Sequence, residues 1–166
     1  MPVLDQQTIL NQIAQHQLVS NLHDPEVQVS ANGVELTLHK IFTFKEAGRV
    51  DFSNAERYIP EYEEHPLENG QYNLQPGTYL VTYNEMVHLP SNLMAFGRPR
   101  SSLLRSGVTV ESAVWDAGYR GRSRGMLTVY NPHGFQVKPN ARLLHLVFIQ
   151  LLQDTEPYAG IYQGET

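Results

Sequence analysis

The sequence contains no cysteine among its 166 residues. Without thiols the chain has no disulfide framework, no cysteine nucleophile and no zinc site of the cysteine type. The zinc-dependent type of nucleobase deaminase is excluded as well, because its metal is held by cysteines. The seven histidines lack the His-x-His and His-Glu-x-x-His spacings, so a preassembled zinc site built from histidine is not expected either.

Long apolar runs and leader-like segments are also missing. No run approaches the roughly 18–20 apolar residues that a membrane span requires, and the N-terminus lacks a basic stretch followed by an apolar one. We therefore expect a cytoplasmic protein that does not insert into a membrane. Neither G-x-S-x-G nor G-x-x-x-x-G-K occurs, which argues against a nucleophile elbow and a P-loop.

Basic residues are few, since 12 Lys and Arg stand against 17 Asp and Glu for a net charge of −5. This balance argues against a nucleic-acid binder, which needs a basic surface. The stretch from Arg98 to Arg124 is the exception, because its six arginines and two acids give it a net charge of +4. The rest of the chain has a net charge of −9. Arginine presents a planar fork of donors to phosphate oxygens, so the cluster indicates a compact polyphosphate ligand. Solvated charges in turns are the alternative.

The 12 glycines and 10 prolines are spread along the chain and punctuate many short segments. Residues 5–17 predict one helix, with Asp5 as its cap, and no other helix is expected. Residues 51–70, rich in glutamate and interrupted by two prolines, predict an exposed loop. Alternating patterns predict strands at residues 27–44 with an Asn-Gly turn at 32–33, and at 77–83, 93–96, 109–114, 125–130 and 141–152. The chain therefore predicts a single all-β domain over residues 1–166, a sandwich, jelly roll or distorted barrel with a short N-terminal helix.

The segment GRPRSSLLRSG, residues 97–107, is the first candidate for binding chemistry. Proline sets the chain direction before Arg100, and the hydroxyls of Ser101 and Ser102 follow at once. Guanidinium, hydroxyl and backbone N–H groups can thus converge on one anion such as a phosphate. Serines in turns also bond their own backbone, which is the alternative interpretation.

The segment VWDAGYRG, residues 114–121, is the second candidate. We expect Asp116 at the tip of a tight hairpin, where a carboxylate partly shielded by aromatic rings can orient and deprotonate a water molecule. A turn aspartate that accepts bonds from backbone amides is the alternative. Tyr119 either stacks on a sugar or packs within the turn, whereas Trp115 is expected in the core. In a third segment, Glu35 lies inside an apolar strand and either pairs with an arginine or a hydrated metal or faces water.

These segments together resemble the superfamily of trimeric dUTPases and dCTP deaminases, in particular its archaeal-type dUTPase members. The resemblance runs over nearly the full length of the chain and in the same order. Four motifs are similar: VELTL at residues 34–38, PRSSLLRSG at 99–107, VWDAGYRG at 114–121 and ARLLHLVF at 141–148. The closing YAGIYQG, residues 158–164, is similar to the tail of the deaminase branch.

The resemblance implies a distorted β-barrel or jelly roll that forms a homotrimer with active sites at the subunit interfaces. Asp116 would orient the water that attacks the α-phosphorus, and backbone groups of its hairpin would read uracil. Tyr119 would stack below the deoxyribose and leave no room for a 2′-hydroxyl. Mg²⁺ would arrive chelated by the triphosphate, with Glu35 as an indirect metal-site residue. The implied substrate-binding residues are Arg100, Ser101, Ser102, Arg105, Tyr119, Tyr162 and Gln163, with residues 156–166 as a closing tail.

By this resemblance the chain is a magnesium-dependent dUTP diphosphatase that produces dUMP and pyrophosphate. A dCTP deaminase, alone or combined with diphosphatase activity, and a non-catalytic deoxynucleotide sensor are the alternatives. Asp116 favours catalysis over sensing, and Thr128 stands where deaminases carry a glutamate. Three departures from the family pattern are His145 in place of a glutamine, the missing Gly-rich and Phe-containing fifth motif, and a longer segment after Gly121.

Overall fold

The structure is a computed structural model that describes residues 2–166. Its first element, α1 (Gln6–His16), confirms the helix predicted at residues 5–17. Oδ1 of Asp5 accepts a hydrogen bond from the Thr8 N–H at 2.9 Å and so satisfies one of the free donors at the helix start. The helix ends at His16, and the following residue, Gln17, takes the left-handed conformation common after a last turn. Ile9 is fully buried and fastens the helix to the core.

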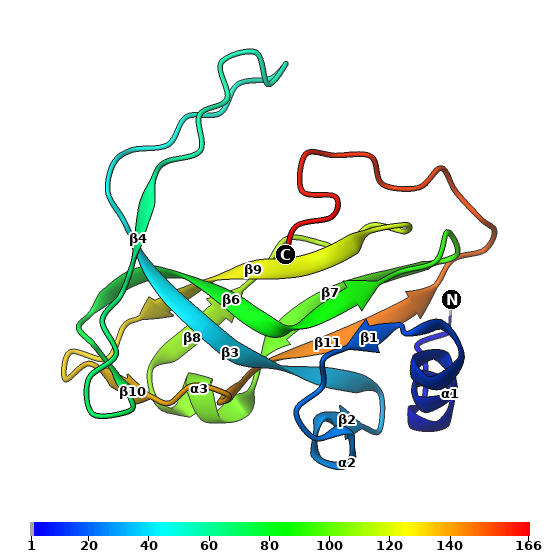
Figure 1. Cartoon of the computed structure of the whole chain (residues 1–166), viewed down its shortest axis with the longest axis horizontal. Coiled ribbons are helices and arrows are strands. Elements are labelled where there is room, and N and C mark those ends of the chain that lie inside the picture. Colours follow the sequence, from blue (N-terminus) through cyan, green and yellow to red (C-terminus); the bar gives the residue numbers. More distant parts are fainter. Residues whose placement is uncertain (1) are drawn as a thin grey trace.

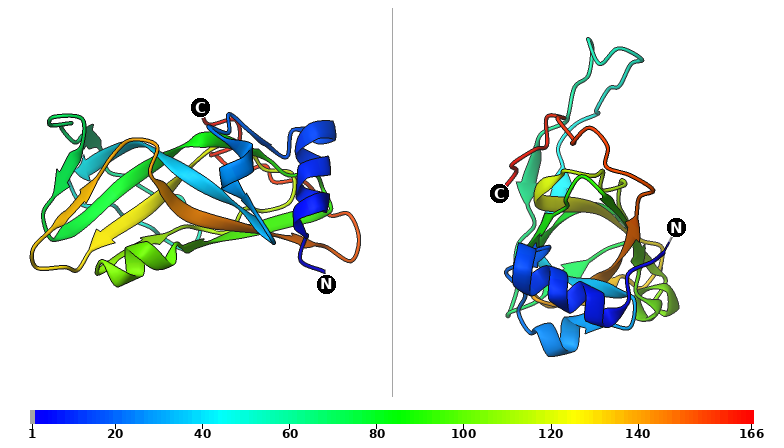
Figure 2. Two further views of the ribbon diagram at one scale, coloured as in Figure 1. Left: turned by 90° about the horizontal axis from the view of Figure 1, so that it is seen from below. Right: turned by 90° about the vertical axis from the view of Figure 1, so that its right-hand side faces the viewer.

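Antiparallel strands build the rest of the domain and curl into a nearly closed barrel (Figure 1). The view along the barrel in Figure 2 shows the strands surrounding the interior and α1 lying across one end. The order of the main strands is β7-β11-β3-β6-β9-β8, which are β7 (Leu93–Pro99), β11 (Arg142–Gln150), β3 (Gly33–Phe44), β6 (Gly77–His88), β9 (Arg120–Val129) and β8 (Val108–Glu111). The short strands are β1 (Val19–Ser20), β2 (Val29–Ser30), β4 (Tyr62–Glu64), and the separate pair β5 (Tyr72–Leu74) and β10 (Phe135–Val137).

Strand β3 shows how alternating residues separate the interior of the barrel from its outer face. Val34, Leu36 and Leu38 alternate along it and are fully buried inside, whereas Glu35 points to the outer face. The predicted hairpin is confirmed, but its turn lies one residue earlier than the predicted Asn32-Gly33: Ser30 is opposite Gly33, so Ala31 and Asn32 form the loop and Gly33 begins β3. The all-β barrel with a short N-terminal helix is therefore confirmed. None of the helices in residues 2–166 is long and apolar enough to cross a membrane.

Two short helices contradict the expectation of a single helix. α2 (Pro25–Gln28) begins at a proline after the capping residue Asp24, and α3 (Ser101–Arg105) directly follows Arg100. With four and five residues, neither is long enough to show helical periodicity in the sequence. The placement of α3 matters for the site, because it turns the predicted phosphate-binding serines into the first residues of a helix.

The segment between β3 and β4 leaves the barrel as a long excursion, which we call the arm (residues 45–61) (Figure 1). Phe52 at its outer part is fully exposed, and Val50 and Ile59 are largely exposed. This confirms most of the loop predicted at residues 51–70. The chain then rejoins the sheet as β4, where Phe42 pairs with Glu64.

Candidate active site

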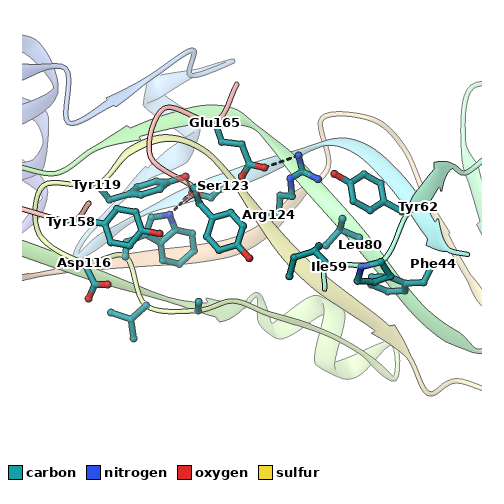
Figure 3. A pocket seen from close by; sticks show the side chains of 15 residues that line it. Phe44, Ile59, Tyr62, Leu80, Asp116, Tyr119, Ser123, Arg124, Tyr158 and Glu165 are labelled. Carbon is teal, nitrogen blue, oxygen red and sulfur yellow. Dashed lines mark hydrogen bonds and ion pairs between the residues drawn. The ribbon is translucent and has the colours of Figure 1, made fainter. Parts of the chain in front are cut away.

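A cavity of about 460 Å³ lies between the arm and the end of the chain, beside strand β9 (Figure 3). One end is apolar and belongs to β3, β6 and the arm, and the other end is formed by the loop of Asp116. Its lining residues are Phe44, Ile59, Pro60, Tyr62, Leu80, Ala113, Val114, Trp115, Asp116, Tyr119, Ser123, Arg124, Tyr158, Tyr162 and Glu165. Three predicted site residues, Asp116, Tyr119 and Tyr162, thus meet in one cavity.

The chain between β8 and β9 forms a wide loop, the Asp116 loop (residues 112–119), and not the tight hairpin we expected. The strand predicted to reach residue 114 ends at Glu111, because Trp115 pairs with Ala95 of β7 instead. Two backbone hydrogen bonds of 2.8 and 2.9 Å join these residues. The Trp115 indole N–H also donates to the Ser123 hydroxyl, and the ring is buried as expected for the core. This anchoring leaves the Asp116 side chain exposed at the cavity.

Tyr119 both lines the cavity and packs within the loop. Its side chain is only 7% exposed, and its backbone N–H donates to the Asp116 carbonyl at 3.1 Å. The ring meets that of Tyr158 edge to face, with 5.7 Å between the centroids. Burial raises the pKa of the Tyr119 hydroxyl, an effect that its hydrogen bond with Ser123 opposes. The phenol is therefore neutral near pH 7 and serves as a rigid wall.

Residues 157–165, which we call the tail, fold back onto the Asp116 loop of the same chain (Figures 1 and 3). Backbone bonds run from the Tyr158 N–H to Ala117 at 2.8 Å and from the Gly164 N–H to Arg120 at 2.8 Å. In a third backbone bond, the Arg122 N–H donates to the Glu165 carbonyl at 2.7 Å. The start of β9 has no β8 partner, because β8 pairs only from Met126 onward, so the tail takes up this free edge.

Gln163 holds the tail through its side chain and does not line the cavity. Its Oε1 accepts from the Arg120 N–H at 2.9 Å, and its Nε2 donates to the Gly118 carbonyl at 3.0 Å. The amide therefore bridges the two backbone groups on either side of Tyr119. A positive φ at Gly118 and the contact with Pro157 there leave no room for a larger residue.

Arg124 lies where the arm, β9 and the tail meet. Its Nη2 forms an ion pair of 2.7 Å with Oε1 of Glu165, and its guanidinium lies 5.0 Å from the ring centroid of Tyr62. Among the residues lining the cavity it is the single Lys or Arg side chain. The arginine-rich segment of residues 98–124 had indicated that an arginine would lie at the ligand site. Nothing in the sequence indicated that Glu165 and Tyr62, both distant along the chain, would contact it.

The predicted phosphate-binding residues lie elsewhere, at α3. Ser101 and Ser102 are exposed in its first turn, and Arg105 ends it. Nε of Arg100 pairs with Oε1 of Glu35 at 2.7 Å, and the other carboxylate oxygen of Glu35 lies 2.8 Å from Nη1 of Arg142. Two arginines thus compensate the largely buried Glu35, as the arginine-paired alternative required. Arg100, Ser101, Ser102 and Arg105 do not line the cavity of their own chain.

Within residues 2–166 no three His, Asp or Glu side chains lie close enough together to hold an ion. Oε1 of Glu35 accepts a hydrogen bond from Arg100, whereas the buried Oε2 lies 2.8 Å from Arg142 without a hydrogen bond. Two neighbouring arginine cations disfavour a metal ion bound directly to this carboxylate. The residues present therefore do not form a cage for a resident Mg²⁺, and the indirect role of Glu35 stays a prediction.

Comparison with known proteins shows where the chain belongs. The family described as dCTP deaminase-like matches residues 3–151. A Methanosarcina mazei protein named "Probable deoxyuridine 5'-triphosphate nucleotidohydrolase" is 51% identical over 152 residues, which cover 89% of this chain and 88% of that protein. A Methanocaldococcus jannaschii protein named "Deoxyuridine 5'-triphosphate nucleotidohydrolase" is 37% identical over 141 residues, 84% of this chain and 89% of that protein.

The fold has a solved counterpart in the crystal structure of 2'-deoxycytidine 5'-triphosphate deaminase from Agrobacterium tumefaciens. The TM-score is 0.68 over 90% of this chain, at 20% sequence identity. The chain spans about half the length of that deaminase, 49%, so this likeness concerns the fold. The family match and the archaeal relatives confirm the resemblance to the dUTPase and dCTP deaminase superfamily. The chain belongs to the dCTP deaminase-like family, in its branch of archaeal dUTPase relatives.

Proposed function

We propose that this protein is a dUTP diphosphatase, a hydrolase that cleaves dUTP to dUMP and pyrophosphate. The observation that carries the proposal is the exposed carboxylate of Asp116 at a cavity with aromatic walls, next to the buried ring of Tyr119. Relatives up to 51% identical bear the name of this activity. The cavity volume of about 460 Å³ lies within the usual range for small-ligand sites.

In this mechanism Asp116 accepts a proton from a water molecule, whose oxygen attacks the α-phosphorus. The bond between the α-phosphorus and the bridging oxygen to the β-phosphate breaks, and pyrophosphate leaves with the electron pair. Tyr119 and Trp115 exclude solvent from one side of the nucleoside. Mg²⁺ would arrive with the substrate, chelated by the triphosphate, and would neutralise charge as pyrophosphate leaves.

We further propose that the phosphate-binding residues act on the substrate of a neighbouring copy in a homotrimer. The triphosphate carries several negative charges, yet the cavity of one chain contains the acids Asp116 and Glu165 and the one arginine Arg124. That arginine is already paired with Glu165. Cations from a second copy would resolve the deficit, and exposed Ser101 and Ser102 beside Arg100 provide a suitable anion-binding set.

Strand β9 supports diphosphatase over deaminase chemistry. Thr128, the residue at the position of the deaminase glutamate, pairs with Thr78 and Thr109. A threonine hydroxyl does not ionise near pH 7, so it cannot take up a proton from water and pass it to a leaving amine as a carboxylate can. The residues around it, Met126 to Tyr130, include no acid.

The test is to incubate the purified protein and Mg²⁺ with each deoxynucleoside triphosphate and to assay pyrophosphate and ammonia separately. We expect pyrophosphate from dUTP and no ammonia from dCTP, with activity lost on chelation and restored by Mg²⁺. Ammonia released from dCTP at a comparable rate would establish the deaminase instead. Tight dUTP binding without release of pyrophosphate would establish the sensor.

A further inference from the structure

A second cavity, of about 420 Å³, brings together side chains from β3, β6, β9 and the loops before α2 and β11. It shares no lining residue with the cavity at Asp116. Its polar lining residues are Asn21, His23, His39, Asn84, Arg122 and Asn140. Leu22 completes the lining, which contains no Asp or Glu of the described chain. The cavity thus combines a permanent positive charge, two imidazoles and three amides without a carboxylate to balance them.

Arg122 supplies the permanent charge, at a point where the sheet is irregular. The register of β6 against β9 shifts between Thr82 and Met86. In this interval Nη1 of Arg122 donates to the carbonyls of Tyr83 at 2.6 Å and Asn84 at 2.8 Å. Within residues 2–166 no carboxylate pairs with Arg122, and its Nε and Nη2 atoms have no hydrogen-bond partner. One edge of the guanidinium therefore remains available to an anion.

A buried carboxylate fixes the orientation of the Asn84 amide. Glu85 is fully buried, and its Oε1 accepts a hydrogen bond from the Thr37 hydroxyl at 2.6 Å. Because that hydroxyl already donates its proton to Glu85, it accepts from Nδ2 of Asn84 at 2.9 Å. The Leu38 carbonyl, which can only accept, is bonded to the same Nδ2 at 3.1 Å. The atom of Asn84 that meets His39 is therefore the amide oxygen.

This orientation sets the groups that the cavity offers to a ligand. Oδ1 of Asn84 lies 3.1 Å from Nδ1 of His39, so Nδ1 donates and Nε2 stays unbonded. Nδ2 of Asn84 also donates to Oδ1 of Asn140 at 2.9 Å, which leaves Nδ2 of Asn140 as a donor without a partner in the described chain. The side chains of Asn21 and His23 form no hydrogen bond within residues 2–166. Together with the guanidinium edge, these groups direct several donors to one cavity, as an oxyanion requires.

We propose that this cavity binds a phosphate group, at a site separate from the Asp116 cavity. A phosphate group presents three strong acceptor oxygens, whereas a carboxylate presents two, so the number of unpaired donors favours phosphate. Nε2 of His39 suits either protonation form of the ligand, because it accepts from a P–OH group when neutral and donates when charged. Inorganic phosphate and the phosphate of a nucleotide share this chemistry, and the experiment below distinguishes them.

Two asparagines of the cavity allow a clean substitution. Asn21 and Asn140 have left-handed backbone conformations, with φ of 61° and 65°. Aspartate also tolerates this conformation, so Asn21→Asp and Asn140→Asp each replace an amide donor by a negative oxygen without backbone strain. Asn54, with φ of 63°, lies in the arm and does not line the cavity. Asn54→Asp is therefore a matched control that makes the same charge change in the same conformation.

The experiment titrates the purified protein with inorganic phosphate, and separately with dAMP, at constant ionic strength, while NMR follows the Nε–H signal of Arg122. We expect a saturable shift with phosphate and none with chloride. Asn21→Asp and Asn140→Asp should each weaken phosphate binding about 10- to 100-fold, the size of a lost hydrogen bond to a charged group. Asn54→Asp should leave the affinity unchanged, and melting temperatures verify that all three variants are folded.

The response to dAMP identifies the source of the phosphate group. A saturable shift with both ligands supports a nucleotide phosphate, and a shift with inorganic phosphate alone supports free phosphate. The proposal is overturned if neither ligand gives a saturable shift, or if chloride gives the same shift. It is also overturned if the folded cavity variants bind phosphate no more weakly than Asn54→Asp, since the cavity would then not be the site. Hydrolysis of dUTP does not enter this comparison, so the proposed function and this site fail independently.

Discussion

Oε1 of Glu165 lies 2.7 Å from Nη2 of Arg124, so the end of the chain is tied to the middle of strand β9. The Arg124 guanidinium also lies over the ring of Tyr62, which follows the arm. One side chain thus connects the two segments that border the cavity (Figure 3). Both members of the ion pair are about 30% exposed, so water weakens the pair only in part.

Arg124→Gln should loosen the tail. The amide keeps no charge to attract Glu165 and offers a weaker contact to Tyr62, so the backbone bond from Gly164 to Arg120 should open more often. We expect amide hydrogen exchange at Gly164 to accelerate roughly fivefold, the scale of one modest ion pair, and the KM for dUTP to rise. Arg49→Gln, which removes a looser exposed pair with Glu56, is the control. Unchanged exchange at Gly164 would show that the backbone bonds alone hold the tail.

Asp116→Asn should keep the fold and the binding of dUTP while losing most turnover. The side chain is exposed, so the amide fits without a packing change, but it does not accept the proton of the attacking water. Loss of a general base typically lowers the rate by about 10²–10⁴. Single-turnover release of pyrophosphate, together with the dissociation constant for dUTP, measures both effects. A kcat near that of the unmodified enzyme would remove Asp116 from the mechanism.

Inactive chains should restore each other's activity if the sites are shared between copies. Arg100→Ala should impair the proposed phosphate-binding side while Glu35 stays paired with Arg142, and Asp116→Asn should impair the cavity side. Refolding the two variants together should regenerate some complete sites and part of the activity. Each variant refolded alone is the control. Mixtures that exchange subunits, as mass spectrometry would verify, and yet stay inactive would contradict the shared site.

His88 should titrate below the ordinary histidine value of about 6.5. Burial, and after it the charge of Arg120, lower its pKa, and its Nδ1 accepts a hydrogen bond from Nε of Arg120 at 3.2 Å. Because the folded-state pKa is depressed, the neutral ring contributes stability above pH 6.5, and that stability is lost as the pH falls below it. NMR titration of the ring should show the low midpoint, and Arg120→Ala should raise it.

The stability consequence can be measured on the same histidine. His88→Gln should flatten the fall of the melting temperature between about pH 7 and pH 5. His133→Gln, at an exposed position, is the matched control. If both variants give the same pH profile as the unmodified protein, His88 does not couple folding to protonation.

Local patterns in the sequence determined much of this protein. Asp5 and the apolar face behind it specified α1, and the period-two alternation in residues 27–44 indicated the long strand β3, although it left open which way Glu35 points. Such signals act between residues a few positions apart, so they can be recognised without the fold. The motif around Asp116 and Tyr119 likewise indicated a nucleotide site, and both residues line one cavity.

Only the tertiary structure decided what those residues contact. Glu35 is paired by Arg100 and Arg142, Trp115 leaves β9 to pair with Ala95, and Glu165 reaches Arg124. These contacts join residues far apart along the chain and depend on strand order and register, which local propensity does not encode. The sequence alone therefore identified the chemical groups, and the closing of the barrel determined which of them meet.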